Sequence, residues 1–117
     1  MDTTENGLLQ VFEALANPHR LRIVASLREK RKYVSELARE INMSRPLLYM
    51  HLQRLETAGL VAGNLELSED GKAMKYYELT EFDYRITPES ITDAARKLND
   101  RASSSLADGQ ISKEEEQ

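Results

Sequence analysis

The chain has 117 residues, of which 40% are hydrophobic and 31% charged, and its formal net charge is -4. This balance is typical of one globular domain. The sequence contains no cysteine, which excludes disulfides, thiolate zinc sites, iron-sulfur clusters and a cysteine nucleophile. It has no apolar run near the roughly 18 residues of a membrane span and no signal-peptide pattern at its start, so we expect a cytoplasmic protein that does not enter membranes.

Positive charge is concentrated in the middle of the chain. Between Pro18 and Ala62 there are nine basic and four acidic residues, so this segment carries a formal charge of +5 while the rest carries -9. A basic segment within an acidic chain is typical of a local anion-binding surface, and it also fits an ordinary solvated face.

Two amphipathic helices are predicted near the start of the chain. Apolar residues recur at helical spacing from Leu8 to Leu15, which predicts a helix that ends before Pro18. Pro18 is expected to begin a second helix that ends near Lys30, because proline is favourable in the first helical turn. Arg20 is expected to lie outside the apolar stripe of this helix. The stripe is predicted to contain Leu21, Val24, Ala25 and Leu27, with Ile23 beside it.

Two further helices follow, joined by a turn of a few residues. Helical spacing of apolar residues predicts a short helix over 34–41, with Ser35 as its N-cap. Ser44 is predicted to cap a longer helix whose Pro46 lies in the first turn, where a missing N–H costs little. Gly59 is expected to end this helix in a left-handed conformation.

The hydrophobic pattern then changes from helical spacing to alternation. Two short runs, 65–67 and 74–79, flank an Asp70-Gly71 pair, which is a strong signal for a β-hairpin. Alternation over 82–86 predicts a further brief strand.

A last helix is predicted to begin at Pro88. Its apolar stripe and that of the first helix exceed what one small core can cover, so we expect both to be buried in a dimer. Residues 1–102 are therefore assigned to one domain with N- and C-terminal dimerisation helices, and residues 103–117 to a flexible acidic tail. The two stripes consist of Leu8, Val11, Phe12 and Leu15 in the first helix and Ile91, Ala94, Ala95 and Leu98 in the last.

The predicted fold is mainly α with one β-hairpin. A short helix, a tight turn and a longer helix make a helix-turn-helix, and the hairpin after it takes the place of the wing in a winged helix. Separated sequence signatures support this order: Leu15–Val24, Val34–Ala38, Met43–Pro46, His51–Leu52 and Ala58–Val61. Through these segments the chain resembles the ArsR/SmtB-type transcriptional regulators over Leu8 to Ile86.

The resemblance implies a homodimer whose first and last helices form the interface and whose helix over 44–58 enters the major groove of double-stranded DNA. It implies a sequence-specific regulator, a repressor bound at an operator. Such proteins often sense metals through cysteines on the short helix or through histidines and carboxylates on the last one. Here the last helix offers Glu89, Asp93 and Asp100 without an imidazole, so we expect no metal site and no cofactor. A small-molecule effector, a protein effector or none remain open.

A helical wheel divides the 44–58 helix into two faces. Leu48, Leu52 and Leu55 form the side expected to be buried, and the other side is expected to face DNA together with the wing. The predicted DNA-binding residues are Ser44, Arg45, Leu47, Tyr49, Met50, Gln53, Arg54, Lys72 and Lys75.

Several residues on the exposed face have predicted roles. Gln53 is expected to read a base edge, and Arg54 to bind phosphate. Arg45 is expected to reach a guanine or a phosphate. Leu47 or Met50 would touch a thymine methyl group.

Two features of this helix allow other interpretations. Leu47, Tyr49 and Met50 are apolar, so the alternative function is a winged-helix protein–protein interaction module that docks a partner through this face. His51 lies beside the buried side, where a core histidine with a satisfied hydrogen bond is favoured over a phosphate ligand.

The wing allows two interpretations as well. Lys72 and Lys75 flank the hairpin turn, where they would approach the minor groove or the DNA backbone. Glu69 and Asp70 share the tip and oppose such a contact.

The sequence shows no recognisable catalytic arrangement. His19 and His51 are far apart in the chain, and His19 is expected to be exposed. No Gly-rich phosphate loop and no serine or carboxylate in a catalytic setting occur. We therefore expect no enzymatic activity.

Overall fold

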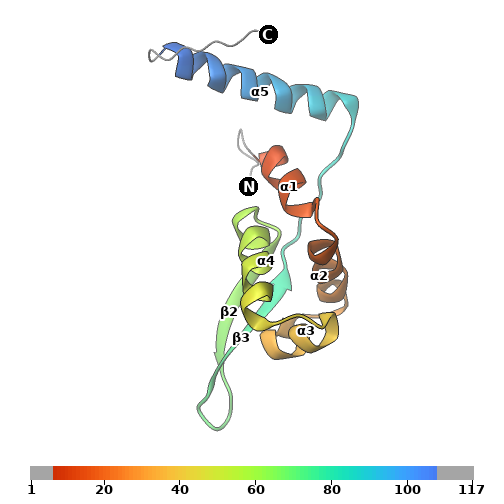
Figure 1. The fold of residues 1–117 in the computed structure, drawn as a ribbon, viewed down its shortest axis with the longest axis vertical. Coiled ribbons are helices and arrows are strands. Elements are labelled where there is room, and N and C mark those ends of the chain that lie inside the picture. Colours follow the sequence, from red (N-terminus) through yellow and green to blue (C-terminus); the bar gives the residue numbers. More distant parts are fainter. Residues whose placement is uncertain (1–6, 108–117) are drawn as a thin grey trace. The chain divides into compact units, whose positions relative to one another are not determined.

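A computed structural model describes residues 7–107 of the chain, with side chains through residue 100 (Figure 1). Five helices and three strands occur within these residues. In chain order they are α1 (Gly7–Leu15), α2 (Pro18–Glu29), β1 (Lys32–Tyr33), α3 (Val34–Ile41), α4 (Arg45–Thr57), β2 (Val61–Leu67), β3 (Ala73–Leu79) and α5 (Pro88–Ala107).

The described residues belong to two compact units, each of which is described by itself. The first unit, Gln10–Asp83, contains most of α1, the helices α2, α3 and α4, and the sheet. The second unit contains α5. None of the helices between residues 7 and 107 is long and apolar enough to cross a membrane.

Helix α4 begins and ends as the sequence predicts. The Ser44 hydroxyl accepts a hydrogen bond from the Leu47 N–H at 3.4 Å, and Pro46 lies in the first turn. Gly59 follows the helix with φ of 81°, a left-handed conformation that is easy for glycine. The predicted turn between α3 and α4 is also present, with Asn42 left-handed at φ 62°.

The start of α3 differs from the prediction. Tyr33, and not Ser35, is the N-cap, and its backbone N–H donates to Glu36 Oε1 at 3.0 Å. The reason is β1, a two-residue strand that pairs Tyr33 with Tyr76 and holds it extended until α3 begins. A strand of two residues is too short to show alternation, so no local pattern indicates it.

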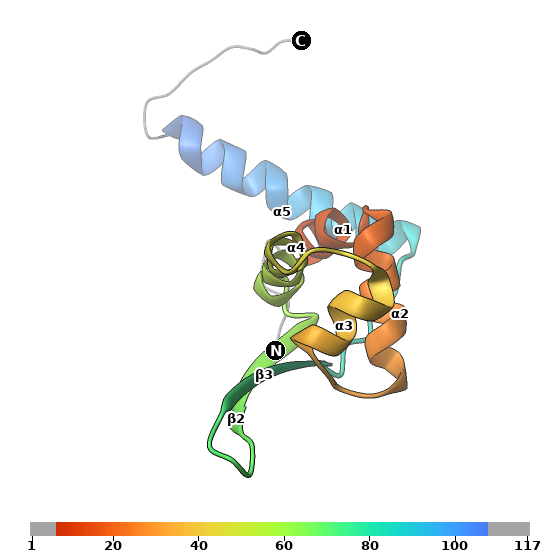
Figure 2. The same ribbon diagram turned by 60° about the horizontal axis from the view of Figure 1, so that its bottom comes forward.

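The core of the first unit lies between its helices and the sheet. The predicted buried side of α4 is confirmed, since Leu48, Leu52 and Leu55 are fully buried. Figures 1 and 2 show α2, α3 and α4 grouped together, with the β2–β3 hairpin extending away from them. The other fully buried large side chains are Ile23, Leu37 and Leu60.

The predicted apolar stripe of α2 is largely wrong. Leu21 is 53% exposed, whereas Arg20 and Ser26 are buried beside Ile23 and Leu27. Polar side chains occupy the inner face because each has an internal hydrogen-bond partner, which removes most of the cost of burial.

The hairpin prediction is confirmed. Strands β2 and β3 pair antiparallel from Val61 opposite Leu79 to Leu67 opposite Ala73, and Gly71 has φ of 85° in the turn. The sheet order is β1-β3-β2. The strand predicted over 82–86 is absent, since residues 80–87 have no regular structure. Of the three apolar residues that alternate there, Phe82 and Tyr84 are half-buried, whereas Ile86 is 63% exposed.

The second unit consists mainly of α5, which begins at the predicted Pro88. Thr87 and Ser90 cap it reciprocally, each side-chain oxygen accepting from the other residue's N–H at 3.0 and 2.9 Å. The helix continues to Ala107, beyond the domain boundary expected at residue 102. The rest of the predicted tail, 108–117, lies outside the described residues.

Candidate nucleic-acid interface

The predicted DNA-contacting side chains of α4 share one exposed face. Leu47, Tyr49 and Met50 are 42%, 41% and 43% exposed, which is unusual for large apolar residues. Tyr49, Met50 and Gln53 lie on the side of the helix opposite the buried leucines, and Leu47, Arg45 and Arg54 flank them. The polar residues on this face, all exposed, are Ser44, Arg45, Gln53 and Arg54.

Two guanidinium groups of this face are free. Within the described side chains, neither Arg45 nor Arg54 has an ion pair or a side-chain hydrogen bond. They lie near the two ends of α4, with Gln53 directly before Arg54. An unpaired guanidinium on a protein surface is available for phosphate or for a base edge.

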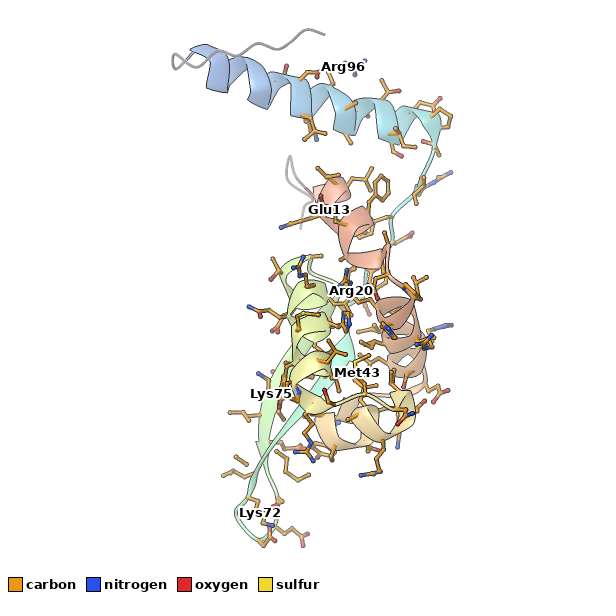
Figure 3. The ribbon with its side chains drawn as sticks, viewed as in Figure 1. Glu13, Arg20, Met43, Lys72, Lys75 and Arg96 are labelled. Atoms are coloured by element: carbon orange, nitrogen blue, oxygen red, sulfur yellow. The ribbon has the colours of Figure 1, made fainter. Side chains whose placement is uncertain are left out.

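His51 is a core residue, in agreement with the favoured interpretation. It is 5% exposed, and the Arg20 guanidinium donates to its Nδ1 across 3.0 Å. Arg20 also donates through Nε to the Ala14 carbonyl at 2.6 Å, so it joins α4 to the end of α1 (Figure 3). Burial, followed by the positive charges of Arg20, His19 and Arg54, lowers the pKa of His51 below its usual value. The imidazole is therefore held neutral as an acceptor.

His19 differs from the expected simple exposure. It is half-buried and not fully exposed, and its Nδ1 lies 2.8 Å from Nη2 of Arg22 on the same helix. Its ring centre lies 5.5 Å from that of His51.

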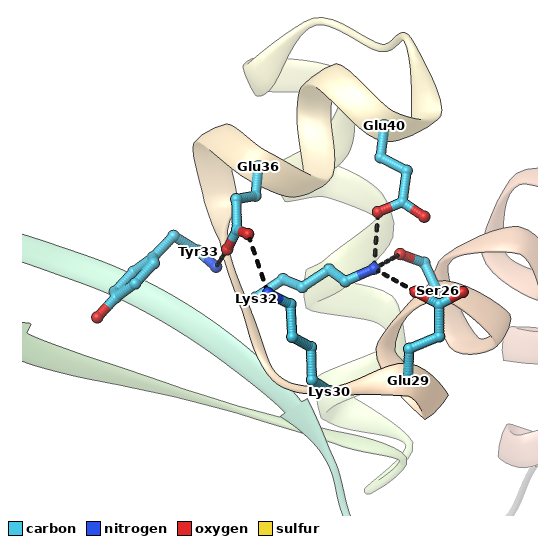
Figure 4. Close-up of polar contacts among 7 residues, drawn as sticks. All are labelled: Ser26, Glu29, Lys30, Lys32, Tyr33, Glu36 and Glu40. Atoms are coloured by element: carbon cyan, nitrogen blue, oxygen red, sulfur yellow. Dashed lines mark hydrogen bonds and ion pairs between the residues drawn. The ribbon is translucent and has the colours of Figure 1, made fainter.

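A buried lysine fixes the first helix of the helix-turn-helix against α2. Lys32 Nζ donates to Ser26 Oγ at 2.8 Å and Glu29 Oε1 at 3.0 Å on α2, and to Glu40 Oε1 at 2.7 Å on α3 (Figure 4). The bond to Glu40 raises the pKa of Lys32, and the same bond lowers the pKa of Glu40. Sequence reasoning missed this cluster, because a lysine after a helix end is normally exposed.

A second polar cluster fixes the base of the wing. Glu66 on β2 accepts a hydrogen bond from the Tyr33 hydroxyl at 2.5 Å and from Arg31 Nη2 at 3.2 Å. The Arg31 guanidinium lies 3.9 Å from the centre of the Tyr76 ring, a cation–π contact. The bonds from Tyr33 and then Arg31 lower the pKa of Glu66. The hairpin is thus attached to the segment that leads into α3.

The two predicted wing lysines occupy different places. Lys72 lies exposed at the tip of the hairpin, and Lys75 lies further along β3 (Figure 3). Lys75 Nζ is 5.5 Å from the centre of the Tyr77 ring. At the tip Glu69 and Asp70 are also exposed, and Asp70 accepts a hydrogen bond from the Ser68 hydroxyl.

The wing also presents two apolar side chains that sequence reasoning did not single out. Leu65 and Leu67 are 71% and 72% exposed. Their positions opposite Lys75 and Ala73 in the register place all four residues on one face of the hairpin. The alternation of residues along β2 indicated that Leu65 and Leu67 lie on the same face.

No group of three or more histidine, aspartate or glutamate side chains in the described part of the chain is placed to hold a metal ion. On α5 the two carboxylates of Glu89 and Asp93 are exposed, and Asp93 pairs with Arg96 at 3.2 Å.

Comparison with known proteins gives consistent matches. Residues 17–62 match the family described as bacterial regulatory protein, arsR family. An uncharacterized HTH-type transcriptional regulator of Methanocaldococcus jannaschii is 40% identical over 84 residues, which are 72% of this chain and 87% of that protein.

Solved structures share the fold. The transcriptional repressor BigR of Xylella fastidiosa superposes with a TM-score of 0.54 at 25% identity, covering 92% of this chain and 91% of that one. A homodimeric winged helix-turn-helix DNA-binding domain of Mycobacterium bovis has a TM-score of 0.55 at 20% identity, covering 92% and 88%. The predicted winged helix-turn-helix fold is confirmed.

Proposed function

Because the chain belongs to the ArsR family of bacterial regulatory proteins, we propose that it is a homodimeric repressor that inserts α4 into the major groove of an operator. Membership of this family makes it a DNA-binding transcriptional regulator and not an enzyme. The proposal adds the assembly, the helix that reads DNA and the direction of regulation.

The observation that carries the proposal is the exposed face of α4. Arg45 and Arg54 have no partner within the described side chains, and Gln53 lies between them in the sequence. Arg54 is assigned to phosphate, Gln53 to a base edge and Arg45 to guanine or phosphate. Leu47 and Met50 would contact thymine methyl groups.

Further contacts are proposed around this face. Ser44 and Tyr49 also lie on this face, and a Ser or Tyr hydroxyl can donate to a phosphate oxygen. Lys72 at the wing tip and Lys75 on β3 would approach the DNA backbone or the minor groove.

The dimer is supported by the exposed stripe of α5. Ile91 and Leu98 are 47% and 36% exposed, although both are large and apolar. A two-fold interface would bury this stripe in both copies. Analytical ultracentrifugation at micromolar concentration should give the mass of a dimer, and a monomer at that concentration would contradict the proposal.

The regulator is proposed to act without a metal sensor. Helix α3 has no thiol, and α5 offers only carboxylates such as Glu89 and Asp93, which are weak selectors for transition metals without imidazole or thiolate. Stoichiometric zinc, nickel, cadmium or arsenite should leave DNA affinity unchanged. A reproducible loss of binding at low micromolar metal would contradict this.

The direct test is fluorescence polarisation with duplexes from the gene's own upstream region, compared with a scrambled duplex of equal length. A specific regulator should bind one upstream duplex at least about a thousandfold more tightly than the scrambled one. Equal and weak binding to both, together with loss of protein capture in a Tyr49→Ala variant, would favour the protein-docking alternative.

A further inference from the structure

A hollow of about 400 Å³ lies between α1 and α4 in the first unit. Its volume falls within the range of small-molecule sites in proteins. Both helices belong to the same compact unit over these residues, so the hollow does not depend on the position of α5. It is lined by Gln10, Glu13 and Ala14 of α1 and by Met50, Gln53, Arg54 and Thr57 of α4.

The charges in this hollow are complementary but unpaired. Glu13 lies on one wall and Arg54 on the other, and within the described side chains neither takes part in an ion pair or a hydrogen bond. Elsewhere in the same unit opposite charges close onto each other, as Lys32 and Glu40 do at 2.7 Å. Opposite charges that line one hollow without pairing match a ligand that carries one charge of each sign.

The other residues that line the hollow indicate which chemical groups the ligand carries. The amide of Gln10 and the hydroxyl of Thr57 can each donate and accept hydrogen bonds. Met50 and Ala14 supply apolar surface, and a methionine side chain adapts to ligands of different shape. A small zwitterion with an apolar group can interact with the charged, polar and apolar residues of the hollow at the same time.

We propose that this hollow binds a free amino acid with an apolar side chain, its carboxylate on Arg54, its ammonium on Glu13 and its side chain against Met50. The regulatory part of the proposal rests on the proposed function, because Gln53 and Arg54 also belong to the DNA-facing surface. An amino acid that binds Arg54 prevents this side chain from binding DNA phosphate. The amino acid therefore weakens operator binding, and the operator weakens binding of the amino acid to the same extent.

The first experiment measures binding without DNA. L-leucine, L-methionine and L-phenylalanine are titrated into the wild-type protein by calorimetry, each as the free amino acid, the N-acetyl acid and the methyl ester. At least one free amino acid should bind, and its two derivatives, which lack one charge each, should bind at least about tenfold more weakly, as expected when a charge-assisted hydrogen bond is removed. Absence of binding at millimolar concentration, or equal binding of the derivatives, would overturn the proposal.

A matched pair of variants locates the site. Glu13→Gln should raise the Kd of the amino acid about tenfold, because the ammonium loses its charged acceptor. Glu81→Gln makes the same chemical change at an exposed carboxylate outside the hollow and should leave the Kd unchanged. Equal affinity of wild type and Glu13→Gln would overturn the assignment, and a folded Glu13→Gln protein is verified by its unchanged circular dichroism.

The second experiment adds DNA. A saturating amino acid should weaken operator binding by wild type in fluorescence polarisation, and Glu13→Gln should bind operator normally without the amino acid while losing most of this response. Amino acid binding that leaves DNA affinity unchanged would overturn the regulatory step. Failure of wild type to bind any duplex would instead contradict the proposed function, while calorimetry still decides whether the hollow is a binding site.

Discussion

Two groups of cations in the first unit differ in what they contact. At the junction of α2 and α3, Lys30, Arg31 and Lys32 each lie within 3.6 Å of a carboxylate. On the exposed face of α4, Arg45 and Arg54 have no such partner among the described side chains. The formal charge of +5 counts both groups equally, yet only the second group is free to bind phosphate.

The difference shows that a run of basic residues is not by itself an anion-binding surface. Lys30, Arg31 and Lys32 form the densest basic run in the chain, and each of them connects parts of the protein. Lys32 joins α2 to α3, and Arg31 joins the same segment to Glu66 in the wing. Isolated arginines on an otherwise apolar helix face are the better candidates for DNA contact.

The largest effect is expected from replacing Lys32, the buried member of the cation group at the junction of α2 and α3. Lys32→Met should lower the free energy of unfolding by about 3 kcal/mol, because it removes the three hydrogen bonds that one buried ammonium group donates to Ser26, Glu29 and Glu40. Urea denaturation measures this. Lys30→Met is the control, since the Lys30 side chain is 66% exposed and its pair with Glu36, at 3.6 Å, contributes at most about 1 kcal/mol. Equal losses in the two variants would show that the burial of Lys32 is not what matters.

The next effect concerns recognition on α4. Gln53→Ala should weaken operator binding by roughly 1 to 3 kcal/mol per base that Gln53 reads, because each such base edge loses its hydrogen bonds. Binding to scrambled duplex and the dependence on salt should stay nearly unchanged. Polarisation against both duplexes separates these quantities, and an equal loss of affinity for both would contradict base reading by Gln53.

A smaller, nonspecific effect is expected when Arg54, one of the two unpaired cations of α4, is replaced. Arg54→Ala should weaken all duplexes alike and reduce the slope of log K against log salt by about 0.9 for each phosphate contact, hence nearly 2 in a dimer. Arg28→Ala is the matched control, because Arg28 is exposed on α2, outside the proposed surface. The same change of slope in both variants would mean that net charge alone, and not the position on α4, controls binding.

Most of the fold could be predicted from the sequence because the relevant signals are local. Caps such as Ser44 and Gly59, the spacing of the α4 leucines and the Asp70-Gly71 turn each depend on a few neighbouring residues. The errors arose where tertiary contacts decide. Strand β1 exists only because β3 pairs with it, and Arg20 is buried only because Ala14 and His51 accept its hydrogen bonds.

The candidate site was predictable in part for the same reason. Helical geometry predicts which side chains of α4 are exposed, and those predicted to contact DNA are all exposed in the structure, whereas their contact with DNA stays a prediction. The sequence did not indicate which cations are free, because their carboxylate partners are not adjacent in the chain. Glu40 lies 8 residues from Lys32, and Glu66 lies 35 residues from Arg31. The hollow beside Glu13 combines two helices that are distant in sequence, and no pattern within one helix indicates it.

Arg20 represents a third kind of cation, a buried guanidinium whose side-chain partner is a neutral imidazole. The groups that face His51 are Arg20, His19 and Arg54, all basic, and together with burial they lower its pKa. The unfolded chain, with a usual histidine pKa near 6.5, therefore binds a proton before the folded protein does. The free energy of unfolding should accordingly be at its full value above pH 6.5 and decrease as the pH falls below it, before the carboxylates titrate.

The pH effect is the smallest of the series, since a single proton changes stability by at most about 1.4 kcal/mol per pH unit. His51→Gln keeps an acceptor for Arg20 but cannot be protonated, so its unfolding free energy should be flat between pH 7.5 and 5.5, about a unit on either side of the usual histidine pKa. Urea titrations at three pH values measure the variant and the wild type. A His51→Gln variant that still loses stability on acidification would assign the effect to another group, and an altered preference for operator over scrambled duplex would show that His51 also acts in recognition.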